Sequence, residues 1–208
     1  MTGYLIGALA GALLGGVSVF AAFGGVTHRR LFLRLCRRKG KWKRVWLVMA
    51  LVSVAVGVYG AWLFGAPSAD FFSFALLGCY LLAMAVTDLR GRYIPDDATV
   101  VFALAALAFR LTLGQPVAAH LLNGLIGALA GGILLGLPHL LRKDEVGLGD
   151  VKLVAAVGLM VGFPSVLYML MRALLFMALF SVIQLLRKKA ALKTQVPLAP
   201  FLFLGALI

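Results

Sequence analysis

Acidic residues are scarce in this sequence. Only seven of its 208 residues are aspartate or glutamate, against 20 lysines and arginines, so the formal net charge is +13. Cysteine is also rare: Cys36 and Cys79 lie far apart and form no CxxC pair. This number and spacing exclude a cysteine-based metal site, and we expect both cysteines to be free thiols.

Apolar side chains, in contrast, are abundant. They make up 63% of the sequence, and the mean hydropathy is +1.05, whereas a soluble domain is nearer half apolar. About 20 apolar residues suffice to cross the hydrocarbon core of a membrane. The sequence therefore predicts an all-α integral membrane protein with about eight transmembrane helices and no separate soluble domain. The apolar runs cover residues 3–26, 45–65, 71–87, 98–114, 119–141, 151–163, 165–186 and 196–208.

The first apolar run is long for a signal peptide. No basic residue precedes it, and no convincing cleavage site follows it. We therefore expect residues 3–26 to be a retained transmembrane helix.

The basic residues are confined to a few segments between these runs. All but two of the 20 lie in segments 28–44, 88–97, 142–152 and 187–193, and the first of these segments alone holds nine. Because positive charge is retained on the cytoplasmic side, we expect these four loops to be cytoplasmic and the N-terminus to lie outside. Segment 28–44 is predicted to contact anionic lipid, with partner docking as the alternative. This placement accounts for the net charge, so we expect no nucleic-acid partner.

Small residues recur every four positions in two of the predicted helices. Such spacing is typical of helix faces that let neighbouring backbones approach closely. The two sets are Gly3, Gly7, Gly11 and Gly15, and Gly124, Ala128, Gly132 and Gly136.

Two of the few acids stand at predicted ends of membrane helices. Asp88 follows run 71–87 and Asp150 precedes run 151–163, so both are expected at the same cytoplasmic depth. An ionisable residue there is costly unless it has a function or a partner. Two facing carboxylates cannot both ionise, so one activates a water while the other, protonated, polarises a carbonyl. We therefore predict an aspartic protease, with a structural pairing to Arg90, Arg92 or Lys152 as the alternative.

Glycine and proline flank the two aspartates. We expect Gly147 and Gly149 to let the backbone bend and an extended peptide come close. Pro95 suits the first turn of the following helix. The sequence offers no cysteine and histidine ligand set, so we expect no metal and no other cofactor.

Three motifs follow one another along the chain: YIPD at 93–96 after Asp88, GLGDVKL at 147–153 and VPLAPFL at 196–202. Together they resemble the motifs of type IV prepilin peptidases, a family of membrane aspartic proteases. The third has Ala199 where the family commonly has glycine. The resemblance covers roughly residues 71–208. Residues 1–65 lack the two CxxC pairs that bacterial members often carry there, so we expect neither zinc nor methyltransferase activity.

The resemblance implies an endopeptidase with catalytic Asp88 and Asp150. Its substrates would be prepilins or pseudopilins, whose short basic leader it removes at the cytoplasmic face of the inner membrane. Pro95 in the first motif, and Pro197 and Pro200 in the third, would belong to the substrate site. The chain would then divide into two N-terminal helices with a basic loop, residues 1–65, and a six-helix peptidase core, residues 66–208.

The remaining acids in these loops have two interpretations. Asp96 and Asp97 follow Pro95 and suit the capping of a helix that starts near residue 98. Asp144 and Glu145 suit solvated loop charges. Alternatively, all four form an acidic rim that receives the basic leader.

Two other function classes remain open at the level of sequence. A proton-coupled transporter also uses membrane carboxylates, but usually shows paired repeats with broken helices, and we find no convincing repeat. A non-catalytic assembly factor has no need of two aspartates at matched depth.

Overall fold

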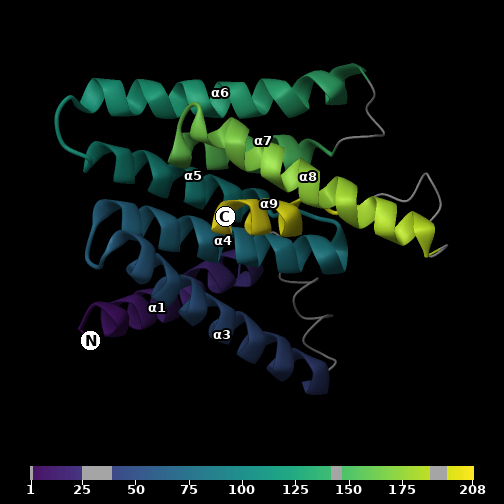
Figure 1. The fold of residues 1–208 in the computed structure, drawn as a ribbon, viewed down its shortest axis with the longest axis horizontal. Coiled ribbons are helices and arrows are strands. Elements are labelled where there is room, and N and C mark those ends of the chain that lie inside the picture. The colour runs from purple at the N-terminus through teal and green to yellow at the C-terminus, as the bar shows by residue number, and fades with distance from the viewer. Residues whose placement is uncertain (1, 25–38, 142–146, 188–195) are drawn as a thin grey trace. The chain divides into compact units, whose positions relative to one another are not determined.

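The computed structural model describes residues 2–24, 39–141, 147–187 and 196–208 (Figure 1). These parts of the chain are helical and contain no strand, which confirms the predicted all-α class. The helices are α1 (Thr2–Gly24), α3 (Lys39–Phe64), α4 (Ala69–Gly91), α5 (Asp96–Leu111), α6 (Val117–Leu141), α7 (Leu148–Val161), α8 (Ser165–Leu186) and α9 (Ala199–Leu207).

Each predicted apolar run corresponds to one helix, but several ends are shifted. Helix α4 continues to Gly91 and α7 begins at Leu148. Asp88 therefore lies inside the last turn of α4, and Asp150 lies inside the first turn of α7. Hydropathy alone placed the end of α4 too early and the start of α7 too late. A helix continues through charged residues as long as its backbone hydrogen bonds are made.

Within the described residues, four helices are long and apolar enough to cross a membrane: 47–64 within α3, and the whole of α4, α6 and α8. Helices α5, α7 and α9 have 16, 14 and 9 residues, and α1 contains a shorter apolar stretch at Thr2–Leu13. At 1.5 Å per residue, 14 residues reach only about 21 Å of a core about 30 Å thick. Eight full spans therefore remain a prediction.

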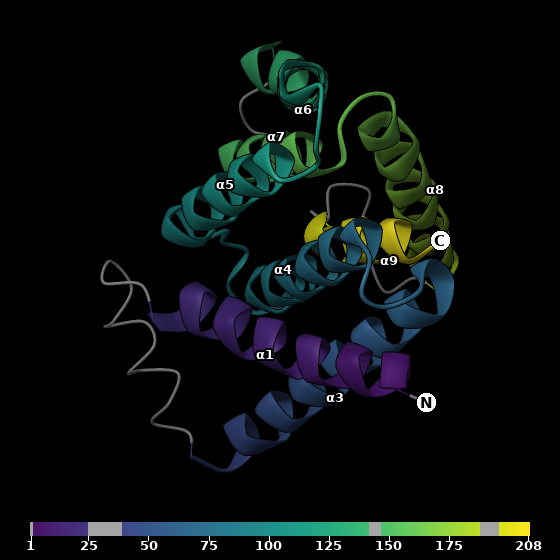
Figure 2. The same ribbon diagram turned by 90° about the vertical axis from the view of Figure 1, so that its left-hand side faces the viewer.

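By their contacts, the residues form two compact units: residues 1–83 with 95–102, and residues 84–94 with 103–208. In the first unit α1 packs along α3, as Figure 2 shows. A Cβ added at Gly7 would lie 2.7 Å from the carbonyl oxygen of Gly57, and one at Gly11 would meet the carbonyl oxygen of Ser53. The predicted close approach of this glycine face is thus confirmed for Gly7 and Gly11.

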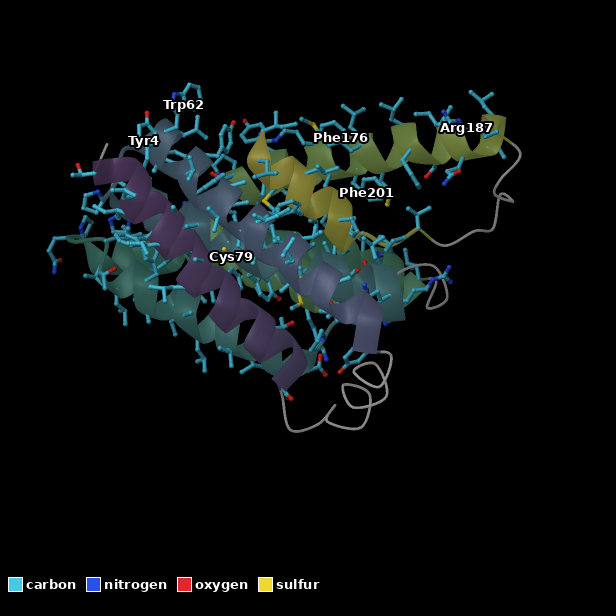
Figure 3. All side chains as sticks on the ribbon, turned by 90° about the horizontal axis from the view of Figure 1, so that it is seen from below. Tyr4, Trp62, Cys79, Phe176, Arg187 and Phe201 are labelled. Carbon is cyan, nitrogen blue, oxygen red and sulfur yellow. The ribbon has the colours of Figure 1, made fainter. Side chains whose placement is uncertain are left out.

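One of the two cysteines lies in this first unit. Cys79 is a buried free thiol whose Sγ lies 3.8 Å from the carbonyl oxygen of Gly11 (Figure 3). This confirms the free thiol predicted there. Cys36 and most of segment 28–44 lie outside the described residues.

The second unit is built on a close pairing of α6 with α7 (Figure 1). Cβ atoms added at Gly124 and Gly131 would come within 2.8 Å of α7, and one at Gly127 would meet the carbonyl oxygen of Gly158. Gly132 and Gly136 make only ordinary contacts at 3.6 Å. The predicted face was thus partly wrong: a spacing of four drifts around a helix of 3.6 residues per turn, whereas alternating steps of three and four stay in line.

The C-terminal helix packs on α8 in the same unit. A Cβ at Gly205 would lie 2.8 Å from the carbonyl oxygen of Met169. The rings of Phe180 and Phe201 lie 5.5 Å apart, and Figure 3 labels Phe201 on α9. These contacts fix the position of a helix that is too short to be stable alone.

Candidate active site

Asp88 is buried at the end of α4, with 6% of its surface exposed. Its Oδ2 accepts a hydrogen bond of 3.1 Å from the backbone N–H of Ala199, which lies 111 residues away. Ala199 is the first residue of α9 and is completely buried. The carboxylate thus occupies the N-terminal end of α9, where helix N–H groups and the helix dipole favour a negative charge.

The local sequence of α9 explains why this N–H needs a distant partner. The carbonyl oxygen of Leu198 accepts the N–H groups of Phe201 at 3.0 Å and Leu202 at 3.1 Å. Pro200 has no N–H, and no side chain next to the helix start caps it. The N–H of Ala199 is the donor left over, and Asp88 accepts it.

The chain leaves α4 through an unusual residue. Arg92 has a φ of 48°, and its N–H donates to the carbonyl oxygen of Asp88 at 2.8 Å. This left-handed position after a helix end is usually glycine, and another residue there costs about 1 kcal/mol. The turn brings the positive charge of Arg92 close enough to act on the Asp88 carboxylate.

Asp150 lies in the first turn of α7 and is half-buried. It is outside the four helices long enough to cross a membrane. Burial, and after it the charge of Asp88, raise the pKa of Asp150 to about 6, against a hydrogen bond from the backbone of Gly147 that lowers it. The charge of Asp88 therefore lies near enough, within the same unit, to influence the protonation of Asp150.

The two glycines before Asp150 have different surroundings. A Cβ at Gly149 would lie 3.3 Å from Cβ of Ile94, so the loop after Asp88 packs directly on the start of α7. A Cβ at Gly147 would meet Oδ2 of Asp150 at an ordinary 3.5 Å. Gly147 has φ −72° and ψ 139°, which any residue adopts, so the bend predicted there does not require glycine. Gly149 is needed for close packing.

The other predicted substrate residues are placed as follows. Pro95 precedes α5 rather than lying in its first turn, and its carbonyl oxygen accepts the N–H of Thr99 at 3.2 Å. Asp96 and Asp97 are exposed in the first turn of α5, where the helix dipole favours acids. Pro197 lies just before α9 and Pro200 in its first turn. Asp144 and Glu145 lie outside the described residues.

Arg110 was not recognised from the sequence as a structural residue. It is 4% exposed and donates to the carbonyl oxygens of Leu159 at 2.7 Å, Met160 at 3.0 Å and His120 at 2.7 Å. Carbonyls at a helix end lack partners within the helix, so this guanidinium caps the end of α7 opposite Asp150. The available signal was its position: it is one of only two basic residues outside the basic loops.

No group of three or more histidine, cysteine, aspartate or glutamate side chains lies together in the part of the chain that the structure describes. The expected independence from metal remains a prediction.

Comparison with known proteins places the chain in a family. The model of the type IV leader peptidase family matches residues 75–182. A prepilin leader peptidase/N-methyltransferase of Burkholderia pseudomallei is 31% identical over 163 residues, covering 76% of this chain and 52% of that protein. The protein of the same name from Bacillus subtilis is 29% identical over 163 residues, covering 78% of this chain and 62% of that protein.

The chain spans little more than half the length of these curated relatives. No solved structure matches it. The segment matched by the family model covers half of the chain and contains both Asp88 and Asp150. This chain therefore belongs to the type IV leader peptidase family.

Proposed function

We propose that this chain is a membrane-embedded aspartic endopeptidase in which Asp88 and Asp150 activate a water molecule. The observation that supports the proposal is that Ile94, in the loop after Asp88, packs on Gly149 at the start of α7, where the charge of Asp88 acts on Asp150 within one unit. A carboxylate pair needs one protonated and one ionised member, and a pKa of about 6 for Asp150 fits a group that holds its proton more tightly than ordinary aspartate.

The substrates we propose are prepilins or pseudopilins, cut at the end of their short basic leader. The relatives are named as prepilin leader peptidases, which supports this class. We assign four residues at two helix starts to the substrate site. Gly147 and Gly149 lie at the start of α7, which carries Asp150, and Pro197 and Pro200 lie at the start of α9, which contacts Asp88. Pro95, Asp96 and Asp97 belong to the first unit, and their part in substrate binding stays a prediction from the sequence.

The proposed setting is a multi-pass protein of the inner membrane with its N-terminus outside. The four long apolar helices support the membrane location, and the distribution of basic residues supports cytoplasmic catalytic loops. Segment 28–44 would contact anionic lipid there. The methyltransferase activity in the relatives' names is not part of the proposal, because this sequence lacks the CxxC pairs associated with it.

The test is cleavage of a purified prepilin by this chain alone in detergent or lipid nanodiscs. We expect a single cut after the glycine that closes the leader, identified by mass spectrometry. A chain that cuts nothing but moves protons across a liposome membrane would instead be a transporter. A chain that does neither, yet binds prepilin, would be an assembly factor.

A further inference from the structure

The two carboxylates of the candidate site have unequal surroundings. Asp88 receives the N–H of Ala199 at 3.1 Å and lies near the charge of Arg92. Asp88 is itself buried, which disfavours its charge, and both of these groups oppose that effect by stabilising the ionised carboxylate. Asp150 is half-buried, and of the groups that act on it, burial and the charge of Asp88 both favour the neutral acid, while only the backbone of Gly147 favours the anion.

We propose that the roles of the two aspartates are fixed by this geometry: Asp88 is the ionised general base and Asp150 carries the proton. The first N–H of α9 is then the positioning group, because it holds one oxygen of Asp88 and stabilises its charge. This inference rests on the proposed peptidase function for its chemistry, but the assignment of the proton is tested below without any substrate.

The assignment gives a balanced reaction. Asp88 takes a proton from the water, whose oxygen attacks the scissile carbonyl carbon, while Asp150 gives its proton to the carbonyl oxygen. The neutral diol then collapses: Asp88 passes its proton to the amide nitrogen, the C–N bond breaks, and Asp150 recovers a proton from one hydroxyl. Both carboxyl groups end as they began.

The structure also explains why the donor is a backbone group. Ala199 is completely buried and Leu198 is 6% exposed, so no water replaces the N–H without opening the start of α9. A side-chain change at position 199 leaves this donor in place. Its contribution must therefore be tested on the backbone itself.

The first experiment removes that single N–H. Ala199→lactic acid, introduced by nonsense suppression in cell-free synthesis into nanodiscs, changes the amide to an ester and keeps the methyl group. We expect the acidic side of the pH dependence of kcat/KM, which reports ionisation of the carboxylate pair, to move to higher pH by about 0.5–1 unit. The reason is that the ionised form of Asp88 has lost a hydrogen bond.

The matched control is Phe201→phenyllactic acid. It removes an N–H of the same helix, one that bonds to the carbonyl oxygen of Leu198 at 3.0 Å and not to Asp88. We expect the acidic side of its pH dependence to stay where it is in the unchanged protein. An unmoved acidic side in the Ala199 ester, or equal shifts in both esters, overturns the positioning role of α9.

The second experiment asks directly which carboxyl is protonated. Infrared difference spectra of the protein alone, titrated across pH 6, report the C=O band of a protonated carboxylic acid. We expect Asp150→Asn to remove this band. Asp88→Asn should retain it with a lower titration midpoint, because the charge of Asp88 no longer opposes ionisation of Asp150.

The reverse pattern, a band that disappears in Asp88→Asn and persists in Asp150→Asn, shows the roles to be exchanged and overturns the inference. A band retained in both variants shows that neither carboxyl holds the proton alone, which also overturns it. Failure of the unchanged protein to cut prepilin refutes the proposed function. The infrared experiment needs no substrate, so it still tests which carboxyl holds the proton.

Discussion

The two aspartates sit at helix ends of opposite polarity. Asp150 occupies the first turn of α7, where the helix dipole favours its charge, and Asp88 occupies the last turn of α4, where the dipole opposes it. Considered helix by helix, Asp150 is the better anion. The start of α9 and the charge of Arg92 act in the opposite direction, since both favour a charge on Asp88. In the roles that we propose, a contact from a distant part of the chain outweighs the local helix dipole.

Removal of either carboxylate should have the largest effect on activity. We expect Asp88→Asn and Asp150→Asn each to lower the rate of prepilin cleavage by a factor of about 1000 or more, with melting temperatures close to that of the unchanged protein. The double variant should be no worse than either single one, because the pair acts as a unit. Activity above about a tenth of the unchanged protein in either variant would refute the role of that residue.

The opposite end of α7 provides a second contrast, between a chemical and a structural role. Arg110→Met would leave the carbonyl groups of Leu159, Met160 and His120 without this donor, so we expect a loss of about 2–4 kcal/mol in unfolding free energy. Arg110→Lys should restore part of it, because an ammonium reaches fewer of these oxygens. The measurement is unfolding in detergent. Equal stability of Arg110→Met and the unchanged protein would show that the cap is dispensable.

The two glycines before Asp150 allow the effects of two alanine substitutions in one loop to be compared. Gly149→Ala brings a methyl group to 3.3 Å from Ile94, so either the loop after Asp88 or the start of α7 must move. We expect about a tenfold loss of kcat/KM. Gly147→Ala, the matched control, meets only an ordinary contact and has a permissive φ, so its activity should stay within about twofold. Equal losses in the two variants would contradict this packing explanation.

The sequence predicted the helices and the position of Asp88 and Asp150 at helix ends, and the catalytic pairing of the two stays a prediction. These follow from hydropathy and from the scarcity of acids. It did not predict that the N–H of Ala199 binds Asp88, because a backbone donor leaves no trace in the pattern of side chains. It left Arg110 unexplained for a related reason: the partners of Arg110 include three carbonyl oxygens, which every residue possesses.

The smallest expected effect concerns acids that surround the site in sequence. Four of the seven acids, Asp96, Asp97, Asp144 and Glu145, lie in the two loops next to Asp88 and Asp150 in a strongly basic chain. Asp96 and Asp97 favour the start of α5, which accounts for them in part. Stabilisation of a helix start does not account for Asp144 and Glu145. We therefore predict that these acids form a rim that attracts the basic leader of the substrate.

An exposed pair of opposite charges contributes about 0.5–1 kcal/mol and is screened by salt. Asp144→Asn combined with Glu145→Gln should therefore raise the Michaelis constant several-fold, by roughly a factor of three to five, and leave kcat nearly unchanged. The effect should fade at high ionic strength. A substrate whose leader charges are neutralised is the matched control, because it has nothing for the rim to attract. If the double variant keeps the normal ratio of efficiencies for charged and neutral leaders at low salt, these acids are solvated loop charges and the leader is recognised by other groups.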